Sequence, residues 1–315
     1  MKRRHQRGAA LLTAMLIVAL VASLASAMVW RQYRAVQIEA ADRARSQSAW
    51  ILQGALDWAR LILREDAAAN RNEPIDHLGE IWAVPLAEAR LSTFLAADRD
   101  NSDDAPEAFL SGALSDAQAR YNLMNLVGGS EVPALELRTL QRLCESAGVS
   151  ADIASRLASQ LRAAHATTPD AATAPLRPQN FEQLRWLGIG AETLERLRPL
   201  VTLLPTATPV NLNTASREVI AALFDGVDLA SAQGLVQARQ SSPLRNIEEA
   251  KAKLPASTVI DAARASVMSS HFWVTGRLRL EERVLEERSL VRRQPNLDMQ
   301  VLSRERVNLV LEAGR

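Results

Sequence analysis

The chain lacks the residues on which several classes of protein depend. Among its 315 residues there is one cysteine, Cys144, so no internal disulfide and no CxxC metal-ligand spacing is possible. Aromatic residues make up only 4%, and 37 basic against 36 acidic side chains leave a net charge of +1. The scarcity of aromatics favours helices over a sandwich of strands, and the charge balance gives no global attraction to nucleic acid. We expect the lone thiol to be a small apolar core residue.

Catalytic and metal-binding signatures are also missing. The HExxH, GxSxG and GxxxxGK[ST] motifs do not occur, and the four histidines stand in unrelated contexts: His5, His77, His165 and His271. The stretch 96–109 begins like an EF-hand loop, but Asp103 stands where the glycine belongs and Phe109 where the closing glutamate belongs. We therefore expect a solvated acidic loop there, no catalytic residue and no metal site.

One long apolar run is present near the N-terminus. From Ala9 to Trp30 there are 22 consecutive residues without a charge, enough for a helix to cross the hydrocarbon core of a bilayer. The basic residues before the run outweigh those after it, which predicts a cytoplasmic N-terminus. The segment is open to three interpretations: a signal peptide cut after Ala27, a plain membrane anchor, or a prepilin leader. Apolar residues continue at helical spacing to Ile62, and this favours one continuous helix over a removable signal.

The residues before the run resemble a prepilin leader, because a short basic segment ends in Gly8 directly before "AALL". The resemblance implies that prepilin peptidase cuts between Gly8 and Ala9 and methylates the new amino group of Ala9. Most pilins and pseudopilins carry Glu at the fifth position after the cut, where this chain has Thr13. The K-type minor pseudopilins of the type II secretion system (the general secretion pathway protein K family) lack this Glu. A subunit at a filament tip has no neighbour above it whose charged N-terminus must be paired inside the membrane.

The remainder of the sequence extends the resemblance over nearly the whole chain. "NLNTA" (211–215) and "NLMN" (122–125), which follows Asp116, resemble segments of the K-type family. Asn211 and Thr214 are expected to close a loop and cap a helix, with Thr214 as the N-cap. "EIWAVPL" (80–86) and the segment 111–127 are predicted to form short strands around turns, 132–265 to be helical, and the period changes to two after Val267.

These patterns predict an α+β fold: a pilin-like long N-terminal helix packed on an antiparallel sheet, with a large inserted all-α domain that contains helix-hairpin-helix-like units. The predicted organisation is a leader (1–8), the transmembrane part of the helix (9–30), a pilin-like domain in two parts (31–130 and 266–315) and the inserted helical domain (131–265).

The helix-hairpin-helix-like units raise a rival hypothesis, a membrane-anchored protein for DNA binding or uptake. Such a hairpin binds phosphate through open backbone N–H groups. Here Asp225 and Asp228 flank Gly226, and Glu192 and Glu195 stand in the other unit. Residues 180–256 carry eight acidic and eight basic side chains, so the block has no basic surface signature. We expect protein packing and no nucleic acid.

The family resemblance implies a non-enzymatic minor pseudopilin at the tip of the pseudopilus that helps to start assembly and the export of folded proteins. It implies as partners the I- and J-type minor pseudopilins, the major pseudopilin, the inner-membrane secretion platform and prepilin peptidase. The expected location is the inner membrane, with a single span and a periplasmic C-terminal domain. Family members often bind calcium through an Asp-rich stretch, but the corresponding segment here has only Asp170 as a carboxylate, so we expect no cofactor.

Overall fold

The computed structural model describes residues 7–91, 108–129, 131–166, 174–280 and 283–309. Most of the expected acidic loop (96–109) lies outside the described residues. The chain divides into two compact units, residues 1–54 and 55–315, and each is described by itself. The domain boundaries expected from the sequence stay a prediction.

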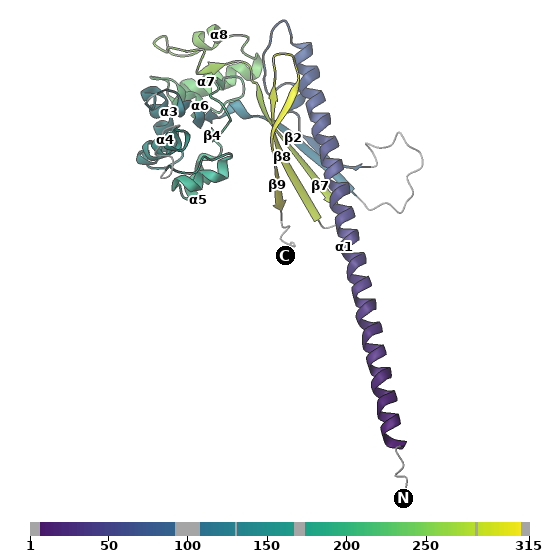
Figure 1. The fold of residues 1–315 in the computed structure, drawn as a ribbon. Helices are drawn as coiled ribbons and strands as arrows, with labels where there is room; N and C mark the ends of the chain where they lie inside the picture. The colour runs from purple at the N-terminus through teal and green to yellow at the C-terminus, as the bar shows by residue number, and fades with distance from the viewer. Residues whose placement is uncertain (1–6, 92–107, 130, 167–173, 281–282, 310–315) are drawn as a thin grey trace, which may run out of the picture. The chain divides into compact units, whose positions relative to one another are not determined.

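Helix α1 runs without a break from Arg7 to Ala69 (Figure 1). In the first unit its apolar side chains from Leu11 to Ile38 are exposed. Among the described residues this is the helix that is long and apolar enough to cross a membrane, judged by its length and composition. The predicted continuation past Ala27 is confirmed, and the helix extends to Ala69.

The second unit is built around an antiparallel sheet. Five strands of the described chain pair in the order β1-β2-β7-β8-β9. Their bounds are Leu86–Arg90 (β1), Ala108–Asp116 (β2), His271–Leu280 (β7), Arg283–Arg293 (β8) and Met299–Leu309 (β9). β2 and β7 are neighbours although the helical region separates them in the chain, and Asp116 is paired with Phe272 where that region begins and ends. Position 112 in this ladder requires glycine, because a Cβ there would come within 2.8 Å of the carbonyl oxygen of Thr275.

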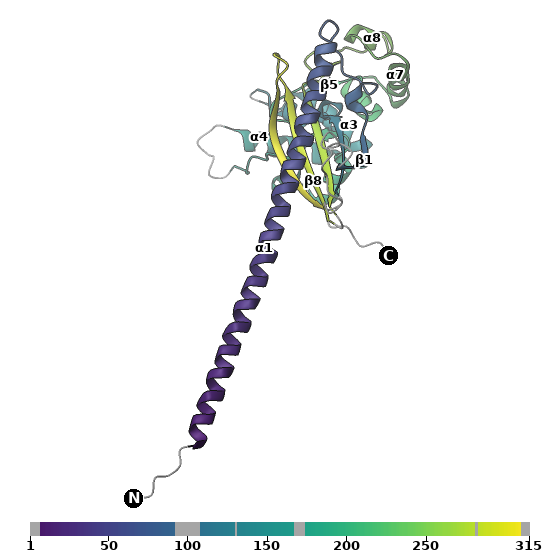
Figure 2. The same cartoon turned by 90° about the vertical axis from the view of Figure 1, so that its right-hand side faces the viewer.

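Successive side chains of each strand point to opposite faces of the sheet, and apolar residues are buried on both faces. One face packs against residues 55–69 of α1, where Leu56 and Leu63 contact Phe272 and Val291. Trp82 completes this cluster with its ring edge-on to Phe272, at a centroid distance of 5.3 Å. The other face carries Trp273 and the buried Leu290 toward the helical region. Figure 2, seen at 90° to Figure 1, shows the C-terminal turns of α1 in front of the sheet and the helical elements behind it.

The inserted region between β2 and β7 is mostly helical. It contains α3 (Ala134–Ser146), α4 (Ala151–His165), α5 (Ala191–Leu197), α6 (Arg217–Leu223), α7 (Leu229–Ser241) and α8 (Ile247–Ala252). In the described part of this region they are accompanied by the 3-10 helices η2 (Ala117–Ala119), η3 (Leu123–Val127) and η5 (Phe181–Leu187). Two short parallel pairs join β3 (Tyr121–Asn122) to β4 (Val201–Thr202) and β5 (Val210–Asn211) to β6 (Ala265–Ser266).

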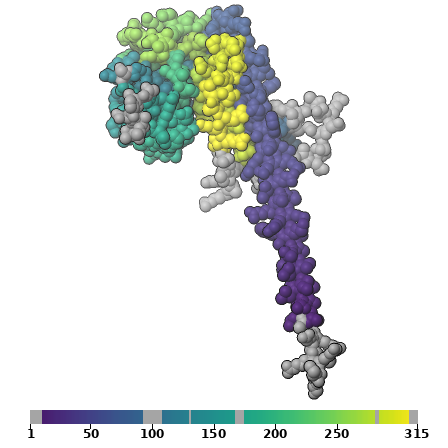
Figure 3. Space-filling view, viewed as in Figure 1, coloured from purple at the N-terminus to yellow at the C-terminus, as the bar shows by residue number. Residues whose placement is uncertain are grey.

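The helical region has a large core of its own. The buried side chains of its helices, Cys144 among them, form one continuous cluster that is separate from the cluster under α1. Burial raises the pKa of the Cys144 thiol to about 11, which fits the expected apolar core residue. In Figure 3 this region forms a rounded mass beside the C-terminal strands. The α+β fold expected from the sequence, with a helical insertion in a pilin-like domain, is confirmed.

Two local expectations are wrong. "EIWAVPL" is not a strand, because Ile81–Ala83 forms a 3-10 turn (η1) that lets Trp82 enter the core. Thr214 does not cap a helix: Ser216 is the N-cap of α6, with its hydroxyl accepting from Val219 N. The Thr214 hydroxyl instead bonds to a buried carboxylate.

Candidate functional site

The leader residues predicted from the sequence lie at the start of α1. The backbone of Gly8 and Ala9 is helical. Thr13 Oγ1 donates to the carbonyl oxygen of Ala10 at 2.9 Å. A hydroxyl that bonds within its own helix needs no partner from a neighbouring chain, so Thr13 is compatible with a lipid environment. Cleavage between Gly8 and Ala9 stays a prediction.

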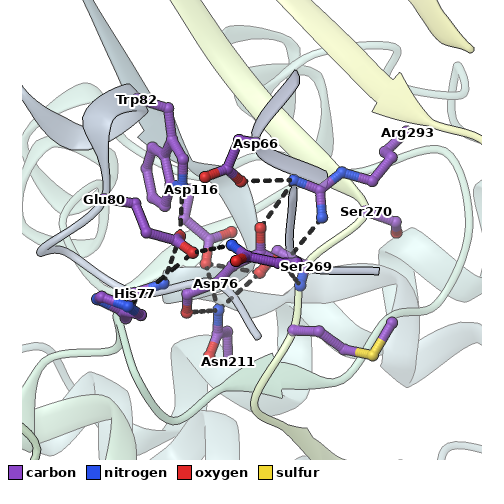
Figure 4. Close-up of polar contacts among 12 residues, drawn as sticks. Asp66, Asp76, His77, Glu80, Trp82, Asp116, Asn211, Ser269, Ser270 and Arg293 are labelled. Atoms are coloured by element: carbon purple, nitrogen blue, oxygen red, sulfur yellow. Dashed lines mark hydrogen bonds and ion pairs between the residues drawn. The ribbon is translucent and has the colours of Figure 1, made fainter. Parts of the chain in front are cut away.

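A buried group of polar side chains lies where the helical region meets the sheet and the end of α1 (Figure 4). We call it the polar junction. Its members are Asp66, Asp76, Glu80, Asp116, Asn211, Thr214, Ser269 and Arg293.

Asp116, the last residue of β2, lies at the centre of the junction. Its Oδ1 accepts from the backbone N–H of Gln118 at 2.7 Å. Its Oδ2 accepts from Thr214 Oγ1 and Ser269 Oγ, both at 2.6 Å, and from Asn211 Nδ2 at 3.0 Å. Burial raises the pKa of Asp116 to about 6, and the hydrogen bonds from Ser269 and Thr214 oppose that rise. One carboxylate therefore joins the end of β2, the middle of the insertion and the return to β7.

The "NLNTA" segment is held on its other side by the insertion. Asn213 exchanges two hydrogen bonds with the backbone of Leu244, each at 2.9 Å. Arg239 of α7 donates to the carbonyl oxygens of Leu212 and Ala215. Because each of these bonds ends on a backbone atom, the side chains fix the path of the segment rather than presenting groups to solvent.

Asp76 and Arg293 form the ionic part of the junction. The guanidinium makes two bonds to the carboxylate, Nη2 to Oδ1 at 2.8 Å and Nη1 to Oδ2 at 3.1 Å. Asp76 is fully buried, and its Oδ2 also accepts from the backbone N–H of Ser269 at 2.7 Å. The guanidinium carbon of Arg293 lies 4.9 Å from the ring centre of Phe272. Two parallel bonds give such a pair both strength and a fixed orientation.

Asp66 and Glu80 bring two further carboxylates to the junction. Asp66 Oδ2 lies 3.7 Å from Arg293 Nη2 and has no hydrogen-bond partner. Burial, reinforced by Glu80 and Asp76, raises the pKa of Asp66 to about 7. Glu80 accepts from Trp82 Nε1 at 2.6 Å, and burial is the largest cause of its raised pKa.

The three carboxylates of Asp66, Asp76 and Glu80 come within 4.8 Å of one another. A cation such as Ca²⁺ needs six to eight oxygen ligands. Both oxygens of Asp76 are already bonded to Arg293. Both oxygens of Glu80 already accept hydrogen bonds, from Asn70 Nδ2 and from the backbone of His77. The donor set therefore suits an internal ion pair better than a metal.

No catalytic arrangement is formed by the histidines of the described residues. His271 Nδ1 lies 2.9 Å from the hydroxyl of Ser270, but burial lowers the pKa of His271 to about 4. His77 faces Glu80 at 3.9 Å, and His165 bonds to a backbone carbonyl. The polar junction fixes the helical insertion to the sheet.

Sequence reasoning identified Asp116, Asn211 and Thr214 only through the family resemblance, and it missed Asp76, Arg293 and their neighbours. No motif marks these residues, since Asp76 and Arg293 lie at opposite ends of the chain. In the sequence, Arg293 is recognisable only as a charged residue at the end of an apolar strand segment.

The hairpin that resembles a DNA-binding module is acidic and already paired. Asp225 forms ion pairs with Arg142 at 2.5 Å and Arg138 at 3.3 Å. Asp228 caps α7 by accepting from Ser231 N at 2.8 Å. These carboxylates occupy the place where a phosphate would need open N–H groups, so nothing in the described geometry favours the DNA-binding hypothesis.

Comparison with known proteins agrees with this architecture. Two family models, both described as type II secretion system (T2SS) protein K, match residues 119–206 and 210–269. A type II secretion system protein K from Pseudomonas aeruginosa is 31% identical over an alignment of 263 positions, which covers 75% of this chain and 73% of that protein. One from Klebsiella pneumoniae is 30% identical over an alignment of 321 positions, which covers 92% of this chain and 93% of that protein.

A solved structure gives the same fold. A chain in the crystal structure of the GspK–GspI–GspJ complex from enterotoxigenic Escherichia coli superposes with a TM-score of 0.65 at 22% identity. The match covers 85% of this chain and 99% of that one. With the identity and coverage of the relatives, these likenesses show that the chain belongs to the type II secretion system protein K family, the minor pseudopilins that its leader and insertion resemble.

Proposed function

We propose that this chain is a structural subunit at the tip of the pseudopilus, where it helps to start filament assembly and so the export of folded proteins. The observation that carries the proposal is the helical insertion between β2 and β7 in a chain of the protein K family. Its bulk would obstruct another subunit above it. The polar junction holds this bulk rigidly on the sheet, as a cap requires.

I- and J-type minor pseudopilins are the partners that this proposal implies. The solved relative is a complex of GspK with GspI and GspJ, and this supports the same kind of assembly here. The major pseudopilin and the inner-membrane secretion platform follow from the position in the filament. We propose that the chain acts as a structural subunit and not as an enzyme.

The membrane arrangement is part of the proposal. The apolar start of α1 fits a single-pass anchor. Four basic residues before Gly8, at positions 2, 3, 4 and 7, support a cytoplasmic N-terminus and a periplasmic second unit. Prepilin peptidase then cuts between Gly8 and Ala9, and Ala9 becomes N-methylated. We keep the boundaries 1–8, 9–30, 31–130, 131–265 and 266–315 as the working organisation.

Secretion by a strain that lacks this chain tests the role. The full-length chain should restore export, and the I- and J-type pseudopilins should copurify with it. Full export in the absence of this chain would contradict the proposal. So would a chain that restores export without associating with either partner.

N-terminal analysis of the mature chain tests the leader. Mass spectrometry should find N-methyl-alanine at Ala9, and Gly8→Ala should leave the leader attached. A mature chain that begins at Met28 would instead identify a signal peptide, and an intact N-terminus would identify a plain anchor.

A further inference from the structure

A cleft of about 170 Å³ lies between the helical region and the face of the sheet opposite α1. Charged and aromatic side chains line it: Arg120, Phe181, Arg198, Trp273, Arg288 and Glu305. They come from the end of η2, from η5 and α5, and from strands β7, β8 and β9. The cleft is distinct from the polar junction, with which it shares no residue.

Three guanidinium groups converge on this cleft, and in the described part of the chain two of them make no direct contact with a carboxylate. Arg198 is neutralised by Glu182 at 2.6 Å and by Glu195 at 2.8 Å. Among the residues that the structure describes, the guanidinium groups of Arg120 and Arg288 form no hydrogen bond or ion pair. Burial lowers the pKa of Arg120, and repulsion from Arg288 and Arg198 lowers it further. Partly buried like charges of this kind are costly unless an anion joins them.

Stacking on aromatic rings fixes two of the arginine side chains in the positions that such an anion would contact. Arg288 lies 4.2 Å from the ring centre of Trp273, and Arg198 lies 4.9 Å from that of Phe181, so two of the three cations are fixed by stacking. The indole N–H of Trp273 is buried and has no acceptor. It is a further unpartnered donor in the wall of the same cleft.

The charged residues that line the cleft indicate the net charge of the ligand that it could bind. Arg198 is already neutralised by its ion pairs. Arg120 and Arg288 against the remaining carboxylate of the lining, Glu305, then leave one net positive charge, which a monoanion balances and a phosphate dianion would exceed. The apolar side chains of Val201, Leu203 and Leu290 line the cleft beside the cations, so it offers room for a hydrocarbon portion. We infer that this cleft binds an organic carboxylate, with its oxygens on Arg120 and Arg288 and its apolar part against the walls. The carboxylate belongs either to a free small molecule or to an acidic side chain of another protein.

Calorimetric titration of the full-length chain in detergent micelles, at pH 7 and constant ionic strength, tests the inference. Benzoate represents the free carboxylate, and N-acetyl-glutamic acid amide represents a protein side chain. Benzamide and N-acetyl-glutamine amide are the matched neutral probes, and inorganic phosphate is the competing oxyanion. We expect at least one carboxylate to bind saturably with a millimolar or lower dissociation constant, its neutral partner not to bind, and phosphate to bind more weakly.

Variants locate the binding. Arg120→Gln and Arg288→Gln should each weaken the binding of the carboxylate about tenfold or more, because each removes a charged donor. Arg288→Lys should recover part of the loss. Arg277→Gln is the control, since Arg277 is on β7 but is exposed and already paired with Glu286 at 3.1 Å. Circular dichroism melts of each variant verify folding, and Arg120→Gln carries the test if Arg288→Gln unfolds.

Three outcomes would overturn the inference: no saturable carboxylate binding up to about 50 mM, phosphate binding as tight as that of the carboxylates, or equal loss in Arg277→Gln. If only benzoate binds, the source is a free molecule. If only the glutamate probe binds, it is a protein side chain.

Discussion

At the residue scale, the polar junction gathers more negative than positive charge in a buried place. Among the described residues, the carboxylates of Asp66, Asp76, Glu80 and Asp116 gather near the guanidinium of Arg293, which forms ion pairs with Asp66 and Asp76 (Figure 4). Breaking a buried ion pair by removing one partner leaves an uncompensated charge, which costs more than the pair itself contributes. The junction should therefore respond strongly to pH and to single substitutions.

The raised pKa of Asp66 predicts how stability depends on pH. Its pKa is about 7 in the folded chain against 3.8 in the unfolded chain, and that of Asp116 is about 6. The folded state therefore holds protons that the unfolded state has released, so stability is highest below pH 4 for these groups and falls as pH rises through 7. By linkage the two carboxyls make the free energy of unfolding about 4 kcal/mol higher at pH 5 than at pH 8. His271 opposes them, because its pKa is lowered to about 4 and the unfolded chain is protonated at pH 5 where the folded chain is not, which offsets about 2 kcal/mol. We therefore expect a net difference of about 2 kcal/mol.

Asp66→Asn isolates this contribution. Thermal melts at pH 5 and pH 8 should show a flatter pH dependence and a higher melting temperature at pH 8 than for the unchanged chain, because the amide is neutral throughout. Exposed Glu65→Gln on the same helix is the matched control. An unchanged slope in Asp66→Asn would show that its pKa is not raised.

Arg293→Met should be strongly destabilising. It leaves the carboxylate of Asp76 buried and unpaired, and we expect a loss of about 3–5 kcal/mol in denaturant titration at pH 7. Arg277→Met, which removes an exposed cation from the same sheet, should cost less than about 1 kcal/mol. Similar losses in the two variants would mean that the junction contributes nothing specific.

At the element scale, periodicity predicted the main parts of the fold. The 3.6-residue spacing of α1 and the alternation of β7 and β8 are visible in the sequence because each element has one apolar face. The turn at Trp82 was not predictable, since a strand reading of "EIWAVPL" and a 3-10 turn bury similar residues. Only the position of Phe272, far away in the chain, decides which one packs.

Leu63→Ala tests the packing of α1 on the sheet. Leu63 is fully buried in the cluster with Phe272 and Val291, so its truncation should cost about 2–5 kcal/mol of unfolding free energy. Leu61→Ala, two residues earlier and 38% exposed, should cost less than about 1 kcal/mol. Equal costs would contradict the assigned helix face.

At the scale of the whole molecule, the order of helix, strands, helical block and strands indicated an insertion, and the leader resemblance indicated the family. Neither could predict that Asp116 of β2, Asn211 and Ser269 meet, because their contact depends on β2 and β7 being neighbours across the insertion. The same reason hid the cleft of Arg120 and Arg288, whose residues come from separate segments.

The helical region should fold without the sheet. Its own core includes fully buried residues from α3, α4, α6 and α7, with no strand of the large sheet among them. Residues 119–268 expressed alone should therefore give a helical circular dichroism spectrum and a cooperative thermal transition. A non-cooperative melt would show instead that the sheet is needed to complete this core.

The pairing of Asp116 with Phe272 has a mechanical consequence. The chain leaves the sheet for the insertion, and returns to it, at the same end of two adjacent strands. A force on the insertion therefore acts on β2 and β7 together, and only a force that separates the two ends would break the ladder, one hydrogen bond at a time. The buried bonds of Asp116 and Asp76 lie at the end where that separation would begin. A load on the insertion, in either direction along the strands, is thus shared by two adjacent strands of the sheet.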